Sequence, residues 1–158
     1  MANAIHRFGP VTPQKWAVAS ATVITRGDML WNNSGEVKPM SDYTWNTDTA
    51  TTQAGAVNLF VGVALEGSAA GSTTPITVDT NPSSVWEMDC ASATFLPSAM
   101  VGPAKASGNA LENQKVASAI TTSSCGRVQT AGTSVTRVQV TFASAYSTAA
   151  NNLNSVVG

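Results

Sequence analysis

The chain has 158 residues, of which 11% are charged, and its formal net charge at pH 7 is −1. Soluble proteins usually carry about 25% charged residues, and this chain has no basic run, which excludes nucleic-acid binding driven by phosphate neutralisation. No apolar run reaches the roughly 18 residues of a membrane-spanning helix, and the N-terminus lacks a signal-peptide core. We therefore expect synthesis in a cytoplasm, with no nucleic-acid and no membrane partner.

The length suits one domain with terminal extensions, and a chain of this size buries roughly 70% of its unfolded surface. Small polar residues take the place of the missing charges, and a net charge near zero favours association over solubility. We predict a β domain over residues 16–143, between an N-terminal arm, residues 1–15, and a C-terminal tail, residues 144–158. The composition favours a component of an assembly.

The predicted arm contains Gly9, Pro10 and Pro13 and shows little hydrophobic periodicity, which is typical of an extended segment. Two interpretations remain open: a frayed terminus, or an arm that lies on a neighbouring subunit. In the second case, the candidate contact residues are Ile5, Arg7 and Phe8.

Short strands and tight turns follow the arm. Residues 15–25 predict one or two strands, and Gly27-Asp28 predicts a turn that leads into Met29-Leu30-Trp31. Asn32-Asn33-Ser34-Gly35 is a strong hairpin signal, because Asn and Gly accept the positive φ angles that tight turns need.

A polar stretch, residues 41–57, interrupts this succession of strands. It is rich in Thr, Asn and Asp, and it carries two aromatic residues, Tyr43 and Trp45. We predict a loop, because a polar connection of this length is usually functional or disordered. Tyr43 and Trp45 are therefore two further candidates for contact with another subunit.

One pattern of strands and glycines occurs twice, in residues 26–78 and in residues 97–142. Each copy has an apolar strand, a polar hairpin, a strand with a glycine, a glycine turn and an alternating strand. This pattern predicts an all-β fold, a small antiparallel β-barrel or sandwich with two pseudo-repeats and at most one short helix. The matched residues are Met29 with Met100, Gly62 with Gly126, Gly71 with Gly132, and Ile76 with Val138.

Two segments of the second copy carry more specific expectations. Residues 114–120 predict a strand, although residues 110–119 also fit a short helix. In the last strand Thr136, Val138, Val140 and Phe142 alternate with polar residues, so we expect these four to form the inner face.

Candidate chemistry is sparse. His6 is the only histidine, and it lies in the arm, so acid–base catalysis would depend on carboxylates. Glu87 and Asp89 alternate onto one strand face, and a glycosidase would need such a pair together with an aromatic cleft. A solvated strand face explains the same pattern, and we favour that interpretation. The tripeptide Arg26-Gly27-Asp28 resembles an integrin ligand, but a turn before a strand explains it fully.

The two cysteines, Cys90 and Cys125, have neither metal-site spacing nor a histidine nearby. We interpret them as two buried small apolar residues, and a disulfide between the two copies remains an alternative. We therefore predict no catalytic site, no metal site and no cofactor.

Three segments of the first copy resemble the capsid decoration, or cement, proteins of tailed bacteriophages. These segments are Gly27-Asp28-Met29-Leu30, Phe60-Val61-Gly62-Val63-Ala64-Leu65 and Ile76-Thr77-Val78. In the second copy, residues 90–104 and Gly126-Arg127-Val128 are similar to the second half of such proteins, so the resemblance spans residues 20–142.

This resemblance implies a non-enzymatic β-barrel on the outer surface of a virion. It implies a homotrimer that contacts the major capsid protein and holds neighbouring capsid subunits together. The alternative from the residues alone is a carbohydrate-binding β-sandwich, in which exposed aromatic side chains stack on sugar rings. Its candidate residues are Trp31, Tyr43, Trp45 and Trp86.

Overall fold

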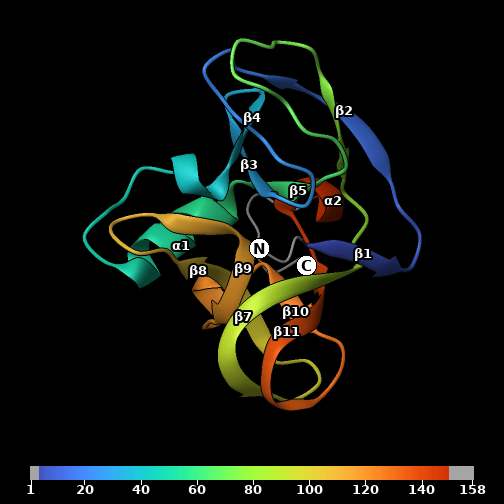
Figure 1. Ribbon diagram of the computed structural model, residues 1–158, viewed down its shortest axis with the longest axis vertical. Coiled ribbons are helices and arrows are strands. Elements are labelled where there is room, and N and C mark those ends of the chain that lie inside the picture. The colour runs from blue at the N-terminus through green and yellow to red at the C-terminus, as the bar shows by residue number, and fades with distance from the viewer. Residues whose placement is uncertain (1–3, 150–158) are drawn as a thin grey trace.

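The structure, a computed structural model, describes residues 4–149, so parts of the predicted arm and tail lie outside the described residues. It confirms an all-β fold with two pseudo-repeats: the chain forms two closed five-stranded β-barrels. In Figure 1 the first barrel occupies the upper half and the second barrel the lower half, with a helix beside the junction between them.

The first barrel closes in the strand order β2-β4-β3-β5-β6, with β6 pairing back onto β2. The hairpin between β3 and β4 has positive φ angles at Ser34 and Gly35, as the sequence predicted, because a two-residue hairpin turn needs them. The five strands are β2 (Pro13–Val18), β3 (Met29–Asn33), β4 (Glu36–Pro39), β5 (Phe60–Ala64) and β6 (Ile76–Asp79).

The second barrel repeats this topology strand for strand, in the order β7-β9-β8-β10-β11. In both barrels the first and third strands in chain order are parallel, and every other neighbouring pair is antiparallel. The five strands are β7 (Val85–Phe95), β8 (Met100–Lys105), β9 (Leu111–Ser118), β10 (Gly126–Val128) and β11 (Gly132–Phe142). Residues 111–118 are therefore a strand, and the alternative of a helix there is wrong.

The strand registers confirm three of the four sequence correspondences. Gly62 lies opposite Leu30 in the first barrel, and Gly126 lies opposite Val101 in the second, so Met29 and Met100 are equivalent. Trp16 pairs with Ile76 just as Met88 pairs with Val138. Gly71 lies in the turn before β6, whereas Gly132 is the first residue of β11, so the fourth correspondence is approximate.

The turn before the second strand is also repeated. The N–H of Asp28 donates to the carbonyl of Thr25, and the N–H of Ala99 donates to the carbonyl of Leu96. The third residue of each turn has a positive φ angle, 94° at Gly27 and 69° at Ser98. A type II turn needs this angle, which explains the glycine in the first copy.

Gly62 and Gly126 permit two strands to approach closely at equivalent places. A Cβ atom on Gly62 would overlap the Asp79 carbonyl of β6, and one on Gly126 would overlap the Val140 side chain of β11. Each glycine therefore makes room inside its barrel, which is why the sequence repeats it.

A helix, α1 (Thr49–Asn58), occupies most of the stretch that the sequence predicted as a loop, so that prediction is wrong. The Asp48 side chain caps it by accepting a hydrogen bond from the Thr51 N–H. Its Thr- and Ala-rich sequence gives little amphipathic signal, although Ala56 and Val57 are fully buried. The helix is an insertion in the first copy, because η2 (Thr121–Ser123) leads almost directly into β10 in the second.

Two hydrophobic cores hold the chain together. The smaller core is the interior of the first barrel, with Leu30, Val37 and Val78 fully buried. The larger core fills the second barrel and continues across the junction to α1 and to the outer face of β3 and β5. Val138, Val140 and Phe142 belong to the larger core, so the predicted inner face of β11 is confirmed for these three residues. Thr136 is exposed, because the register of β11 shifts beside it.

We expect Gly62→Ala to lower the free energy of unfolding by about 1–3 kcal/mol or more, because the added methyl group must displace the β6 backbone. Urea denaturation checks this value. Gly67→Ala is the control, since its Cβ would lie 3.1 Å from the nearest atom, the Ile24 carbonyl oxygen. Equal stability of the Gly62→Ala variant and the wild type would contradict the tight strand contact.

Candidate functional site

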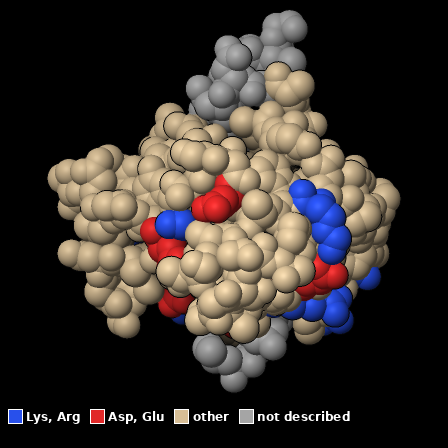
Figure 2. All heavy atoms as spheres, turned by 90° about the horizontal axis from the view of Figure 1, so that it is seen from above, with Lys and Arg blue, Asp and Glu red and all other residues tan. Residues whose placement is uncertain are grey.

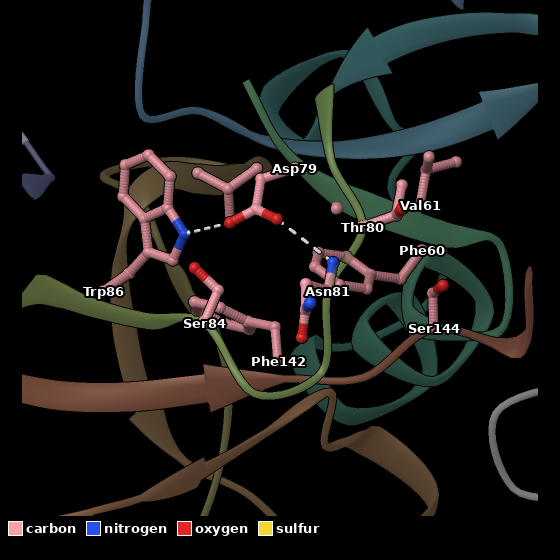
Figure 3. Close-up of a pocket in the computed structure, with 11 residues that line it drawn as sticks. Phe60, Val61, Asp79, Thr80, Asn81, Ser84, Trp86, Phe142 and Ser144 are labelled. Carbon is pink, nitrogen blue, oxygen red and sulfur yellow. Dashed lines mark hydrogen bonds between the residues drawn. The ribbon is translucent and has the colours of Figure 1, made fainter. Parts of the chain in front are cut away.

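The second barrel packs against the outer face of the first through a buried polar contact. The indole Nε1–H of Trp86 donates to Asp79 Oδ2 at 3.0 Å, as Figure 3 shows. The backbone N–H groups of Thr12 and Asn81 donate to Oδ1 of the same carboxylate, at 3.2 and 3.0 Å. Asp79 is 4% exposed and Trp86 is 1% exposed. This buried carboxylate therefore has donors for both of its oxygens, one of them from the other barrel.

Apolar side chains surround this contact. Phe60 of the first barrel and Phe142 of the second place their ring centroids 5.6 Å apart. The cavity that remains beside them is about 10 Å³, roughly the smallest volume that holds a single water. Figure 3 shows these side chains around Asp79, and the space left between them is too small for a ligand larger than a water.

A second polar link joins the barrels at Gln114 of β9. Its Nε2 group donates to Asp28 Oδ1 at 2.8 Å and to the Arg26 carbonyl at 3.1 Å. Its Oε1 atom accepts from the Ala4 N–H at 2.7 Å. Burial raises the pKa of Asp28, while hydrogen bonds from the Thr25 N–H and from Gln114 oppose this shift. One side chain thus connects the N-terminal segment to both barrels.

The inserted helix provides a third link. Gln53 of α1 is buried, and its Nε2 group donates to the carbonyl of Pro103 in β8. The helix contacts both β8 and the η2 turn of the second barrel. The insertion in the first copy therefore contacts the second barrel.

Within the predicted arm, residues 5–8 form strand β1 (Ile5–Phe8), which pairs with β7 of the same chain, and residues 13–15 already belong to β2. A bulge between His6 and Phe8 lets both Ile5 and Phe8 face the same side, since their partners on β7 are Glu87 and Val85. Ile5 is 43% exposed and Phe8 is 55% exposed. The arm is therefore docked on its own chain and presents two apolar side chains outward.

Arg7 holds this strand in place. Its guanidinium binds the Glu87 carboxylate through two hydrogen bonds of 2.8 and 3.0 Å. Arg137 of β11 bridges Glu87 and Asp89, at 2.7 Å from each carboxylate. The Arg7 hydrogen bond is the main cause that lowers the pKa of Glu87, and Arg137 adds to it. The two acids are thus brought together on one strand face, and arginines bind both carboxylates.

Tyr43 and Trp45 are half-buried and pack against the larger core. The Tyr43 ring meets the Trp31 ring edge-on, with centroids 5.0 Å apart. Lys105 Nζ lies 5.5 Å from the centroid of Trp45. Trp31 and Trp86 are buried, so these two side chains offer no platform to a sugar. The arm residues and this aromatic pair are separate sites.

The structure also locates the tripeptide and the cysteines that the sequence singled out. Asp28 of the Arg26-Gly27-Asp28 tripeptide is 4% exposed, so it is not presented to a receptor. Cys90 and Cys125 are free and buried, and burial raises the pKa of Cys125 to about 12. Over residues 4–149 there is no group of three His, Cys, Asp or Glu side chains placed to bind a metal ion. Within the same range, no helix has the length and apolarity to cross a membrane.

Charged side chains are few on the face seen in Figure 2, where they form small separate groups in a largely uncharged surface. A scan of protein-family models gives no match to this chain, and a search of curated proteins gives none either.

Sequence reasoning missed the residues that join the barrels: Gln53, Asp79 and Gln114. One signal was present, namely a difference between the two copies. The register makes Asp79 equivalent to Thr141 and Asp28 equivalent to Ala99, so the first copy carries acids where the second does not. An acid present in one copy of a repeated barrel and absent from the other indicates a position where the first copy accepts hydrogen bonds from its partner barrel.

We expect Arg7→Gln to raise the pKa of Glu87 toward its usual value of 4.5, because the largest stabilisation of the carboxylate is lost. The lowered pKa belongs to the folded state, so this stabilisation is present above pH 4.5 and is lost as the pH falls through the folded-state pKa. Carbon-13 NMR titration measures the shift. Lys15→Gln, which removes the distant Lys15–Glu66 pair, is the control. An unchanged pKa would show that β1 is not docked as described.

We expect Trp86→Phe to cost more free energy of unfolding than Trp31→Phe. Both changes remove an indole and leave a similar void, but Trp86 donates to a carboxylate and Trp31 to the Pro39 carbonyl. Hydrogen bonds to charged groups contribute about 1.5–3 kcal/mol, against about 0.5–1.5 kcal/mol for neutral ones. Urea denaturation of both variants gives the difference, and a larger cost for Trp31→Phe would refute this ranking.

Proposed function

We propose that this chain is a structural virion protein, which decorates the outer surface of a tailed-phage capsid and bridges neighbouring major capsid subunits. The observation that carries the proposal is the surface of β1, where a bulge brings Ile5 and Phe8 to one exposed side. A strand that is paired to the second barrel and carries two exposed apolar side chains on one side suits contact with another protein.

The surface composition supports the same role. With 11% charged residues, the chain can meet another protein over a polar, hydroxyl-rich area without removing many charges from water. A capsid repeats each contact many times, so modest contacts at each position add up to a large stabilisation of the shell.

The segments that resemble decoration proteins also support the proposal. Gly27-Asp28-Met29-Leu30 forms the turn and the start of β3, and Phe60–Ala64 is the adjacent strand β5. These two strands form part of the face on which the second barrel packs. In this proposal the protein is made in the host cytoplasm, forms a homotrimer and has no enzymatic activity. The carbohydrate-binding alternative is less favoured, because two of its four aromatic residues are buried.

We expect an antibody raised against the purified chain to label the outside of intact phage heads in cultures that produce it. Electron microscopy with gold-labelled antibody checks this location. We also expect Phe8→Asp, supplied in place of the wild type, to be depleted from the heads, because a charge at the apolar contact opposes binding. Leu59→Asp, a similar change at a residue that is 42% exposed, is the control. Labelling of cells alone, with unlabelled heads, would rule out the proposal.

A further inference from the structure

The same outer face is covered in the first barrel and open in the second. In the first barrel, the outer side of β3, β5 and β6 lies under the second barrel, and Met29 on this side is 0% exposed. In the second barrel, the outer side of β8, β10 and β11 borders an open hollow of about 330 Å³. Met100, the equivalent of Met29, lines this hollow and is partly exposed.

Positions at the edge of the junction in the first copy are more apolar in the second copy. Asp28 accepts a hydrogen bond from Gln114 of β9, and the backbone N–H of Ser41 donates to Asn113 of β9. Thr25 and Ser41 are themselves exposed and border the groove beside this contact. The register makes Ala99 the equivalent of Asp28. It also makes Ser118 the equivalent of Pro39, so Ile120, two residues after Ser118, is the equivalent of Ser41. Likewise Leu96 replaces Thr25 at the first position of the repeated turn.

These residues gather at one place on the second barrel. Leu96 is 70% exposed and Ile120 is 64% exposed, the two largest values among the exposed large apolar side chains of residues 4–149. The Ala119 N–H donates to the Met100 carbonyl at 3.0 Å, which places Ile120 next to Met100. Arg127 Nη1 donates to the Ser98 carbonyl at 3.0 Å, so the turn that carries Leu96 adjoins the hollow. We call Leu96, Met100 and Ile120 the second-barrel patch.

We infer that the second-barrel patch binds a second copy of this chain. In the first barrel, the same face already accepts a barrel of this fold. Leu96 and Ile120 are exposed apolar residues where the first copy has exposed polar ones, which indicates that this part of the second barrel meets another surface in the assembled protein. The hollow contains one cation, Arg127, and no acid, so the contact leaves few charges to remove from water.

This inference rests on the homotrimer of the proposed function, for which it names the contact surface, but it does not depend on the capsid location, because it concerns self-association in solution. The patch also differs from the arm residues Ile5 and Phe8, which lie on β1 beside β7. If both surfaces act, one joins copies of the chain and the other reaches the capsid.

Sedimentation velocity of the purified chain over a range of concentrations tests the inference. We expect the wild type to form a discrete oligomer, and the double variant Leu96→Asp/Ile120→Asp to associate at least tenfold more weakly. Both side chains are largely exposed, so the fold should tolerate the change, which circular dichroism verifies. Val23→Asp is the matched control, because Val23 is an apolar residue that is 56% exposed and borders a different groove.

A second measurement needs no variant. We expect amide hydrogen exchange in residues 96–100 and 119–121 to slow as the concentration of the wild type rises, since a second copy would cover them.

A wild type that stays monomeric, or a double variant that associates as strongly as the wild type, would overturn the inference. So would equal weakening by Val23→Asp. A double variant that associates normally but is depleted from phage heads would assign the patch to the capsid instead. A monomeric wild type that still labels heads would overturn this inference and the homotrimer, but not the capsid location.

Discussion

The packing of the second barrel on the outer face of the first is the constraint on which the rest of the structure depends. A small β-barrel normally leaves its outer surface to water, but here Met29 and Val63 on that surface are 0% and 1% exposed. Their burial joins the outside of one barrel to the interior of the other in one core. Because this core is continuous, the two copies form one rigid unit, and the arm, the helix and the second-barrel patch have fixed positions on it.

Polar links give this junction its orientation. Burying a carboxylate costs free energy unless donors replace its water, and Asp79 receives three such donors, one of them from the opposite barrel. Asp28 pairs with Gln114 in the same way, although burial still raises its pKa. Apolar surfaces alone slide past one another with little penalty. A shift of one barrel on the other would leave these buried carboxylates without their donors, which costs free energy. Asp79 and Asp28 therefore select one arrangement of the barrels.

Much of the fold could be predicted from local patterns, whereas the contacts between distant segments could not. The β3–β4 hairpin followed from Asn32-Asn33-Ser34-Gly35, and the buried face of β11 followed from alternation at Val138 and Val140. Helix α1 was missed because its Thr- and Ala-rich sequence has a weak periodic signal, and its burial against β8 and the η2 turn comes from the tertiary fold. The candidates Tyr43 and Trp45 were visible as aromatic residues, but no sequence pattern indicated that they pack against the larger core.

The sequence by itself determined that the chain is all-β and is built from two copies of one strand pattern. Glycines at strand contacts, turn residues and a period of two are local properties, and each copy carries its own set. Only the tertiary structure decided that each copy closes a separate barrel, and that one barrel covers a face that the other leaves open. The physical reason is that covering depends on which distant surfaces meet. Equivalent positions such as Met29 and Met100 have the same residue, and only the packed fold makes one buried and the other partly exposed.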